Sequence, residues 1–186
     1  MSKKSFVVML VSAIVMWLGA HSFAGDNNYV GVDDCKKCHK KDKKGAQYKK
    51  WLEGPHAKAY KTLATDDAKK LAEKAGVKGD PQKSEKCLKC HVTGYGLAAD
   101  RFGEKYKKED GVGCESCHGA GSAYKKKKVM KDRDKAVAAG LVIPDEKVCT
   151  GCHNDESPTF KEFKFDERLK EIAHPIPEGA KGGSEE

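Results

Sequence analysis

The sequence predicts a mainly α-helical, irregular fold of short helices and long loops, with a core filled by something other than its own side chains. Three observations lead to this prediction. No stretch alternates polar and apolar residues for long enough to indicate a sheet. Charged residues make up 34% of the 186 residues and hydrophobic residues only 38%, so a protein core is hard to build. Finally, the motif CxxCH occurs four times and uses all eight cysteines.

Residues 1–24 are predicted to be a signal peptide. Lys3 and Lys4 form a basic start, and residues 6–18 are an apolar run that is too short to cross a membrane. Residues 22–24 (Ser-Phe-Ala) match a cleavage site, so residues 25–178 are expected to form one domain and 179–186 a flexible tail. Export places the chain in the periplasm, or outside the cell, with no integral membrane segment after cleavage.

The net charge limits the classes of partner. The formal charge is +8, and lysine runs occur at 40–44, 49–50 and 125–128. A basic surface favours an acidic protein or an anionic membrane, and nucleic acid is not expected outside the cytoplasm. The oligomeric state cannot be predicted from this pattern.

The four CxxCH motifs predict covalently attached haem. Two cysteines three residues apart lie one helical turn apart and can bind the two vinyl groups of one haem, while the next histidine is held beneath the iron. Zinc sites and disulfides do not require a histidine after every cysteine pair. The sequence therefore predicts a multihaem c-type cytochrome with four c-type haems as its core. The attachment residues and proximal ligands are Cys35, Cys38 and His39; Cys87, Cys90 and His91; Cys114, Cys117 and His118; and Cys149, Cys152 and His153.

Helix signals before the second motif predict an extended start and two helical segments. Residues 25–34 are expected to lead into the first motif without a helix. Helical spacing covers residues 47–63, with an interruption at Gly54-Pro55. Thr65 is a typical N-cap, and the helix that it begins is expected to stop at Gly76.

From the second motif on, polar caps again mark the helix starts. Ser84 is expected to begin the helix of the second motif, and the glycine-rich residues 94–113 are expected to be loop. Asp132 begins a helix that Gly140 closes, and Asp145 begins the helix of the fourth motif. A last helix is predicted over residues 166–173.

Few residues remain as sixth ligands of the irons. After the signal peptide and the motifs are set aside, only His56 and His174 are left among seven histidines, and both are predicted distal ligands. Met130, the one methionine that follows the cleavage site, is a further candidate. Two histidines cannot serve four irons, so at least one haem is predicted to be five-coordinate or capped by Met130, a lysine or a neighbouring chain.

Several longer segments resemble the cytochrome c-554 family, the tetrahaem cytochromes of ammonia oxidisers. They are CKKCHK, HAKAY, CLKCHVTGYG, GVGCESCHGAG, CTGCHND and FKFDE, all in family order. The resemblance implies that His56 is the distal ligand opposite His118, and that His174 is the distal ligand opposite His153. It further implies an open, five-coordinate haem at His91, with the stretch 157–160 lining the open face.

The chain departs from this family after the third motif. Relatives carry a histidine there that ligates the first haem, whereas residues 122–130 read SAYKKKKVM and place Tyr124 or Met130 near that position. The first haem, at His39, is therefore left with methionine, tyrosine, lysine, a ligand in trans or no sixth ligand.

The favoured function is electron transport between redox partners by transfer from haem to haem. The positive charge of the chain favours acidic proteins as these partners. In the resembling family the partner is hydroxylamine oxidoreductase. Two other functions stay open: reduction of a small ligand such as nitric oxide at an open haem, and a role as a subunit of a cytochrome filament or complex.

Overall fold

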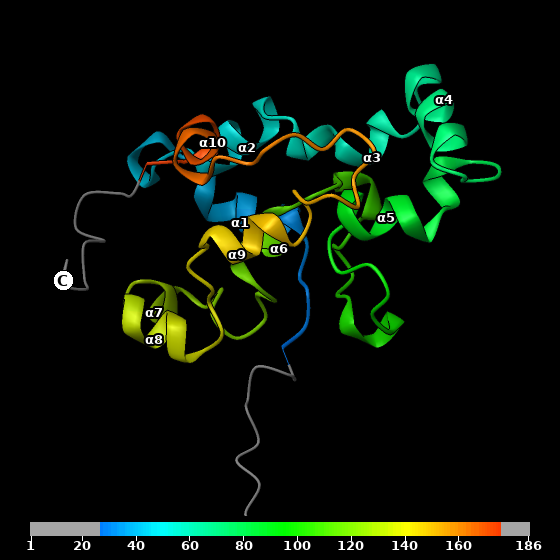
Figure 1. The fold of residues 1–186 in the computed structure, drawn as a ribbon. Coiled ribbons are helices and arrows are strands. Elements are labelled where there is room, and N and C mark those ends of the chain that lie inside the picture. Colours follow the sequence, from blue (N-terminus) through cyan, green and yellow to red (C-terminus); the bar gives the residue numbers. More distant parts are fainter. Residues whose placement is uncertain (1–26, 176–186) are drawn as a thin grey trace, which may run out of the picture.

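The computed structural model describes residues 27–175, and this part of the chain consists of helices and loops (Figure 1). The single pairing of extended segments in it is an isolated parallel bridge between Tyr29 and Phe102. The mainly α-helical fold is thus confirmed. Of the helices within 27–175, none is long and apolar enough to cross a membrane. The predicted signal peptide and the predicted tail from 179 lie outside the described residues.

The elements before the second motif follow the predicted pattern closely. Helix α1 begins at Val32, so the extended lead-in is shorter than expected. Gly54 and Pro55 separate α2 from the next turn, as predicted. The Thr65 hydroxyl accepts a hydrogen bond from the backbone N–H of Ala68 at 3.2 Å and caps α4. These elements are α1 (Val32–His39), η2 (Asp42–Lys44), α2 (Gln47–Glu53), η3 (His56–Lys58), α3 (Ala59–Thr62) and α4 (Asp66–Lys74).

The elements from the second motif on differ from the prediction at two places. Asp132 and Asp145 cap α8 and α9 as predicted, each accepting a backbone hydrogen bond. However, α9 ends at Thr150, so Cys152 and His153 of the fourth motif lie in the turn that follows it. A short helix, α7, forms within the lysine run and was not predicted. The elements are η4 (Pro81–Lys83), α5 (Glu85–His91), η5 (Ala99–Arg101), η6 (Lys108–Asp110), α6 (Cys114–His118), α7 (Lys127–Met130), α8 (Arg133–Ala138), α9 (Glu146–Thr150) and α10 (Phe165–Ile172).

The core made by the chain's own side chains is small. Tyr60, Leu63, Leu88 and Val92 form a cluster between α3 and α5, and Cys87 of the second motif packs against it. Eleven hydrophobic residues are buried in the described part of the chain. A domain of this length ordinarily buries far more apolar surface. The small core agrees with the expectation that bound groups supply the missing apolar surface.

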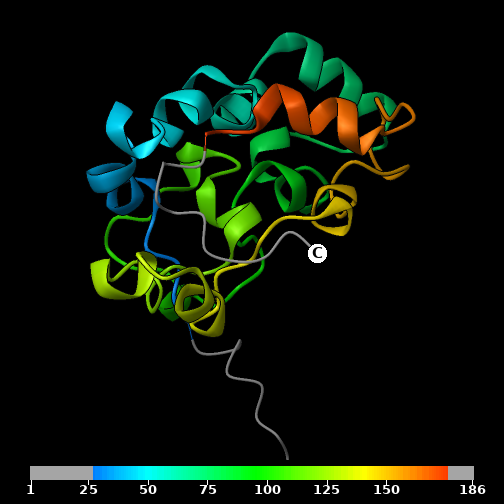
Figure 2. The same cartoon turned by 90° about the vertical axis from the view of Figure 1, so that its left-hand side faces the viewer.

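The short helices are arranged so that motifs far apart in the sequence come together. Helix α1 packs against α6. In Figure 2, α6 (lime) lies between α1 (blue) and α9 (yellow), so the third motif is central. The segment after α10 returns to the start of α2, where Gln47 donates a hydrogen bond to the carbonyl oxygen of Pro175. The last described residues therefore lie near the start of the domain.

Candidate haem sites

The rings of the four motif histidines are held in place by neighbouring residues. In three of them Nδ1 lies next to an oxygen acceptor: His39 at 3.1 Å from Oε1 of Gln47, His91 at 2.8 Å from the carbonyl oxygen of Ala59, and His118 at 3.0 Å from that of Val142. Because oxygen accepts, Nδ1 donates, and Nε2 is left unprotonated and able to bind a metal. The fourth ring, His153, is stacked on Phe163 with the ring centroids 4.8 Å apart.

Cysteines of different motifs lie next to one another. The Cys114 thiol is the main cause that raises the pKa of Cys35, so the first and third motifs are neighbours. Burial raises the pKa of Cys152 to about 12, and the adjacent Cys90 thiol adds to the rise. Burial likewise raises the pKa of Cys117 to about 11, with a further contribution from Cys149. The motifs therefore follow one another in space in the order first, third, fourth, second.

Two of the motif histidines face a second histidine. The ring centroids of His56 and His153 are 6.1 Å apart, and those of His118 and His174 are 5.8 Å apart. An iron bound by two imidazole nitrogens would separate the ring centroids by roughly 6 Å, since metal–nitrogen bonds are about 2 Å long. Ordinary aromatic contacts reach the same separation, so the distance is informative chiefly because one ring of each pair is a motif histidine. The residues present fit a group with two axial histidines at both places.

The protonation state of these rings suits metal binding. Desolvation lowers the pKa of His56, and the nearby His153 lowers it further. Desolvation also lowers the pKa of His118, against a smaller opposing effect of its hydrogen bond to Val142. A lowered pKa keeps the imidazole neutral near pH 7, which is the form that coordinates iron.

The observed pairing corrects one expectation. The resemblance implied that His56 faces His118 and that His174 faces His153, whereas the structure pairs them the other way round. The reason lies in the path of the C-terminal segment. The segment after α10 returns to the start of α2, where Pro175 meets Gln47. This brings His174 to the side of the first and third motifs, where His118 and then His39 further lower its pKa after desolvation.

In the second motif, the ring of His91 is held by a hydrogen bond. The segment 157–160, which was predicted to line the open face of this haem, begins beside the motif. His91 donates to Ala59 of α3. Lys89 of α5 forms an ion pair with Glu156, so the segment 157–160 begins next to the second motif. Phe160 in that segment is 44% exposed. No second histidine within residues 27–175 pairs with His91.

In the first motif, the ring of His39 is held by a side chain, that of Gln47, rather than by a backbone carbonyl. Gln47 accepts from His39 through Oε1, and its Nε2 donates to the carbonyl oxygen of Pro175 at 3.3 Å and to that of Lys44. One amide thus touches the first motif and the residue that follows His174.

The two candidates for the position opposite His39 differ in their surroundings. Tyr124 is buried, and its hydroxyl donates to the carbonyl oxygen of Gly119 at 2.8 Å. Burial raises the pKa of Tyr124, so it stays a neutral phenol and is a poor iron ligand. Met130 ends α7, which packs chiefly against α8. Its role as a ligand at the first motif stays a prediction.

The chain is similar to known cytochromes in sequence and in structure. A family model described as cytochrome c554 and c-prime matches residues 34–119. Cytochrome c-554 of Nitrosomonas europaea is 30% identical over 198 residues, which cover 88% of this chain and 81% of that protein. The chain belongs to the cytochrome c554 family. The structure of reduced cytochrome c554 from the same organism is similar, with a TM-score of 0.60 and 28% identity over 79% of this chain and 84% of that one.

Membership of the cytochrome c554 family implies covalently bound c-type haem and a role in electron transfer with redox partners. The likeness of the solved structure extends to the fold, which is mainly helical in both. The assignment of the histidine pairs described above to haem sites stays a prediction.

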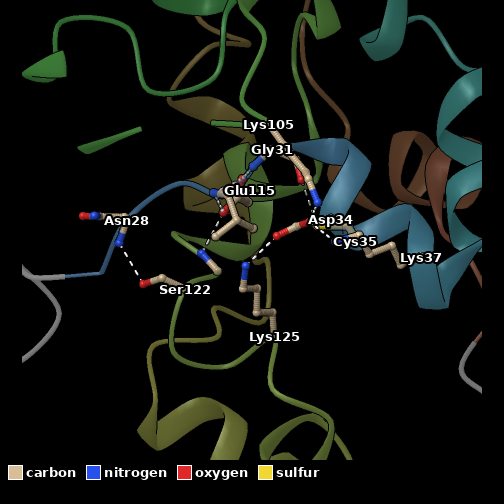
Figure 3. A network of polar contacts seen from close by, with 11 residues as sticks. Asn28, Gly31, Asp34, Cys35, Lys37, Lys105, Glu115, Ser122 and Lys125 are labelled. Atoms are coloured by element: carbon tan, nitrogen blue, oxygen red, sulfur yellow. Dashed lines mark hydrogen bonds and ion pairs between the residues drawn. The ribbon is translucent and has the colours of Figure 1, made fainter. Parts of the chain in front are cut away.

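Within this cytochrome c554 fold, a buried carboxylate joins the first and third motifs. Glu115 is 4% exposed, and its oxygens accept hydrogen bonds from the backbone N–H groups of Val30, Gly31 and Gly121 at 2.7–3.1 Å (Figure 3). Burial is the largest influence and raises the pKa of Glu115, while the three N–H groups oppose the rise. The carboxylate fixes the segment before α1 to the start of α6.

Beside Glu115, an acidic pair in the first turn of α1 gathers lysines from three segments. Asp34 forms ion pairs with Lys37 at 2.5 Å, Lys105 at 3.1 Å and Lys125 at 2.5 Å, and Figure 3 shows the three side chains converging on it. Asp33 pairs with Lys107 at 2.7 Å. We call these four lysines the paired lysine cluster. Hydrogen bonds from Lys125 and Lys37 lower the pKa of Asp34 strongly.

The sequence did not predict the contacts of three residues at these sites: Gln47, Phe163 and Glu115. Gln47 had no signal, because its role depends on the return of the C-terminal segment. Phe163 lies in the FKFDE segment that carries the family resemblance, but its stacking on His153 could not be foreseen. Glu115 lies between the two cysteines of the third motif, and an acidic residue at such a position gives no indication of burial.

Proposed function

We propose that the chain is an exported tetrahaem cytochrome that carries single electrons between redox partners. Residues 1–24 are its signal peptide, residues 25–178 its one haem-binding domain, and the periplasm its compartment. The observation that carries the proposal is the two pairs of facing histidines, with ring centroids 5.8 and 6.1 Å apart, each of which includes one CxxCH histidine. When bound, c-type haem supplies one-electron redox chemistry at an iron whose potential depends on its axial ligands and its burial.

The residues have separate roles in this proposal. The eight motif cysteines attach four haems, and His39, His91, His118 and His153 are the proximal ligands. His56 and His174 are the distal ligands opposite His153 and His118. Gln47 and the carbonyl oxygens of Ala59 and Val142 hold three proximal rings and leave Nε2 free. The order of the motifs in space gives a path from the first motif through the third and fourth to the second.

The test is a count of haems and spin states in the oxidised protein. Mass measurement and a pyridine haemochrome assay should give four haems per chain, and electron paramagnetic resonance should give at least two low-spin irons with two histidine ligands. Fewer than four haems, or no low-spin iron at all, would rule out the proposal.

The first motif needs a separate measurement. If Met130 is the sixth ligand at His39, the oxidised protein absorbs near ~700 nm, as iron with histidine and methionine ligands does. We expect this band to disappear in Met130→Ala. If the band is absent from the unchanged protein, His39 has no methionine opposite it, and a ligand in trans from a filament or complex is then detected as a change of spin state on assembly.

A second candidate function is reduction of a small ligand such as nitric oxide at the second motif. The observation that favours it is the fixed ring of His91, together with the lack of any facing histidine in the described chain. Addition of nitric oxide to the reduced protein should then change the spectrum of one five-coordinate haem and be followed by reoxidation. Binding without reoxidation would contradict a reductase and leave the carrier function intact.

A further inference from the structure

Six lysines that follow the first motif are exposed and form no ion pair with any residue of 27–175. They lie between the end of α1 and the first half of α2. Asp42 is the single acidic residue between positions 36 and 52. We call these six residues the unpaired lysine surface: Lys40, Lys41, Lys43, Lys44, Lys49 and Lys50.

The paired lysine cluster shows how different this surface is. There, Asp33 and Asp34 neutralise lysines from three segments of the chain at 2.5–3.1 Å. Charges that are paired within the chain attract a partner weakly, because the opposite charge beside them cancels most of the field. The unpaired lysine surface keeps its field and can act beyond the chain.

The attachment site next to this surface is the most accessible of the four. Cys38 is exposed, whereas the other seven cysteines are partly buried. Cys38 and His39 directly precede Lys40, so a group bound at the first motif has its Cys38 side next to both solvent and the lysines. The first motif also stands at one end of the spatial order of the motifs.

We propose that the unpaired lysine surface is the docking site for an acidic redox protein, which exchanges electrons with the chain at the first motif. The inference rests on the proposed electron-carrier function. The exchange would move one electron and make no bond: a reduced partner would lose the electron, and a haem held by Cys35, Cys38 and His39 would accept it. Opposite charges steer the encounter and orient the partner, so the association is fast and weakens with salt.

A protein partner fits this surface better than a membrane does. A helix that lies on a lipid surface needs a continuous apolar face beneath its basic residues. Here the hydrophobic residues between Lys40 and Lys50 are Ala46 and Tyr48 alone. Tyr48 is half-buried beneath the Lys36 ammonium, which lies 4.8 Å from its ring centroid. Carboxylates of an acidic protein match the charge without any apolar contact.

The test measures electron transfer from a reduced plant-type ferredoxin, an acidic one-electron protein, by stopped flow. The chain used is the full haem protein. We expect the triple variant Lys41→Gln, Lys43→Gln and Lys44→Gln to lower the second-order rate constant about tenfold at low ionic strength, and to flatten its dependence on salt.

The matched control removes the same charge from another exposed run. The triple variant Lys126→Gln, Lys127→Gln and Lys128→Gln should keep the rate constant within about twofold. Equal losses in both triple variants would show that net charge alone matters and would overturn the docking site. No loss in the first variant would overturn it as well.

Two further measurements separate this proposal from its alternatives. Reduction by dithionite should be equal in all three proteins; if the unchanged protein cannot be reduced, the electron-carrier function fails and not merely the docking site. Cosedimentation with phosphatidylglycerol vesicles at physiological salt should be absent. Vesicle binding that is lost in the first triple variant, with an unchanged rate for ferredoxin, would assign the surface to a membrane instead.

Discussion

The third and fourth CxxCH motifs each have a histidine opposite their own, whereas the first and second do not within the described chain. The two facing histidines come from opposite ends of the domain, His56 from η3 and His174 from the end of α10. The complete motifs lie at the centre of the spatial order, and the incomplete motifs lie at its ends. If the histidine pairs ligate haem, the third and fourth motifs have both axial positions filled from within the chain, and the first and second motifs each keep one position for another ligand.

The largest effect is expected when one of the two facing histidines, His56 or His174, is removed. His56→Ala should convert the iron of the fourth motif from low spin to high spin, and His174→Ala should do the same at the third motif, because each iron loses its sixth ligand. Electron paramagnetic resonance of the oxidised variants counts the change. The two variants should affect different haems, and a signal from the third motif in His56→Ala would restore the pairing that the family resemblance implied.

A second variant tests Glu115, the carboxylate that joins the third motif to the segment before the first motif. Glu115→Gln replaces an oxygen that accepts backbone N–H groups by an amide NH₂ that cannot accept, next to donors that remain buried. We expect a loss of about 2–3 kcal/mol in the free energy of unfolding, measured by chemical denaturation of the haem protein. Ser116→Ala, which changes a neighbour in the same motif that is bonded to Thr93, should cost less. Equal losses would refute a special role of the carboxylate.

The first and second motifs, which have no facing histidine in the described chain, differ in the group that accepts a hydrogen bond from the motif histidine. His91 donates to a backbone carbonyl, which no substitution removes, but His39 donates to a side chain. Gln47→Glu places an anion at Nδ1 and should lower the reduction potential of the first haem, whereas Gln47→Leu removes the acceptor and should raise it. Redox titration followed by absorption measures both. Shifts of the same sign would contradict the role assigned to Gln47.

The smallest effect on the free energy of unfolding is expected from a change to Asp34, the acidic residue of the first motif's helix that pairs with three lysines. The pKa of Asp34 is lowered by its lysines, so its contribution to stability is present above the ordinary carboxyl pKa and is lost as pH falls through the lowered value. Asp34→Asn should therefore destabilise the protein at pH 7 by about 1 kcal/mol or less, since the partners are solvated. The loss should be smaller at pH 2, because part of the contribution has disappeared below the ordinary carboxyl pKa. Denaturation measured at both values checks the sign, and an equal loss at pH 2 would exclude an electrostatic origin.

Much of the domain could be predicted from local sequence. The caps at Thr65, Asp132 and Asp145 act within one turn of the chain, and the break at Gly54-Pro55 is a property of those two residues alone. The proximal ligands are likewise predicted from local sequence, because each CxxCH motif contains its own histidine, and they stay a prediction.

The unpredicted features are those that depend on distant segments. Which motif His174 faces is decided by the return of the segment after α10 to the start of α2, and no residue near position 174 predicts that return. The burial of Glu115 and the contact of Gln47 with Pro175 depend on the same long-range packing. The early end of α9 at Thr150 is a local miss: the motif turns after its first cysteine, and its spacing alone cannot distinguish a turn from a helix.

The closeness of Cys35 to Cys114 and of Cys90 to Cys152 has a consequence for the biogenesis of the protein. Thiols that are neighbours in an oxidising compartment form disulfides readily. A chain that reached this fold before haem attachment would be exposed to cross-links between the first and third motifs and between the second and fourth. Such cross-links would block four of the eight attachment positions. We expect maturation of the chain to require that its cysteines stay reduced, and the folded arrangement to be reached only once the thioether bonds have consumed them.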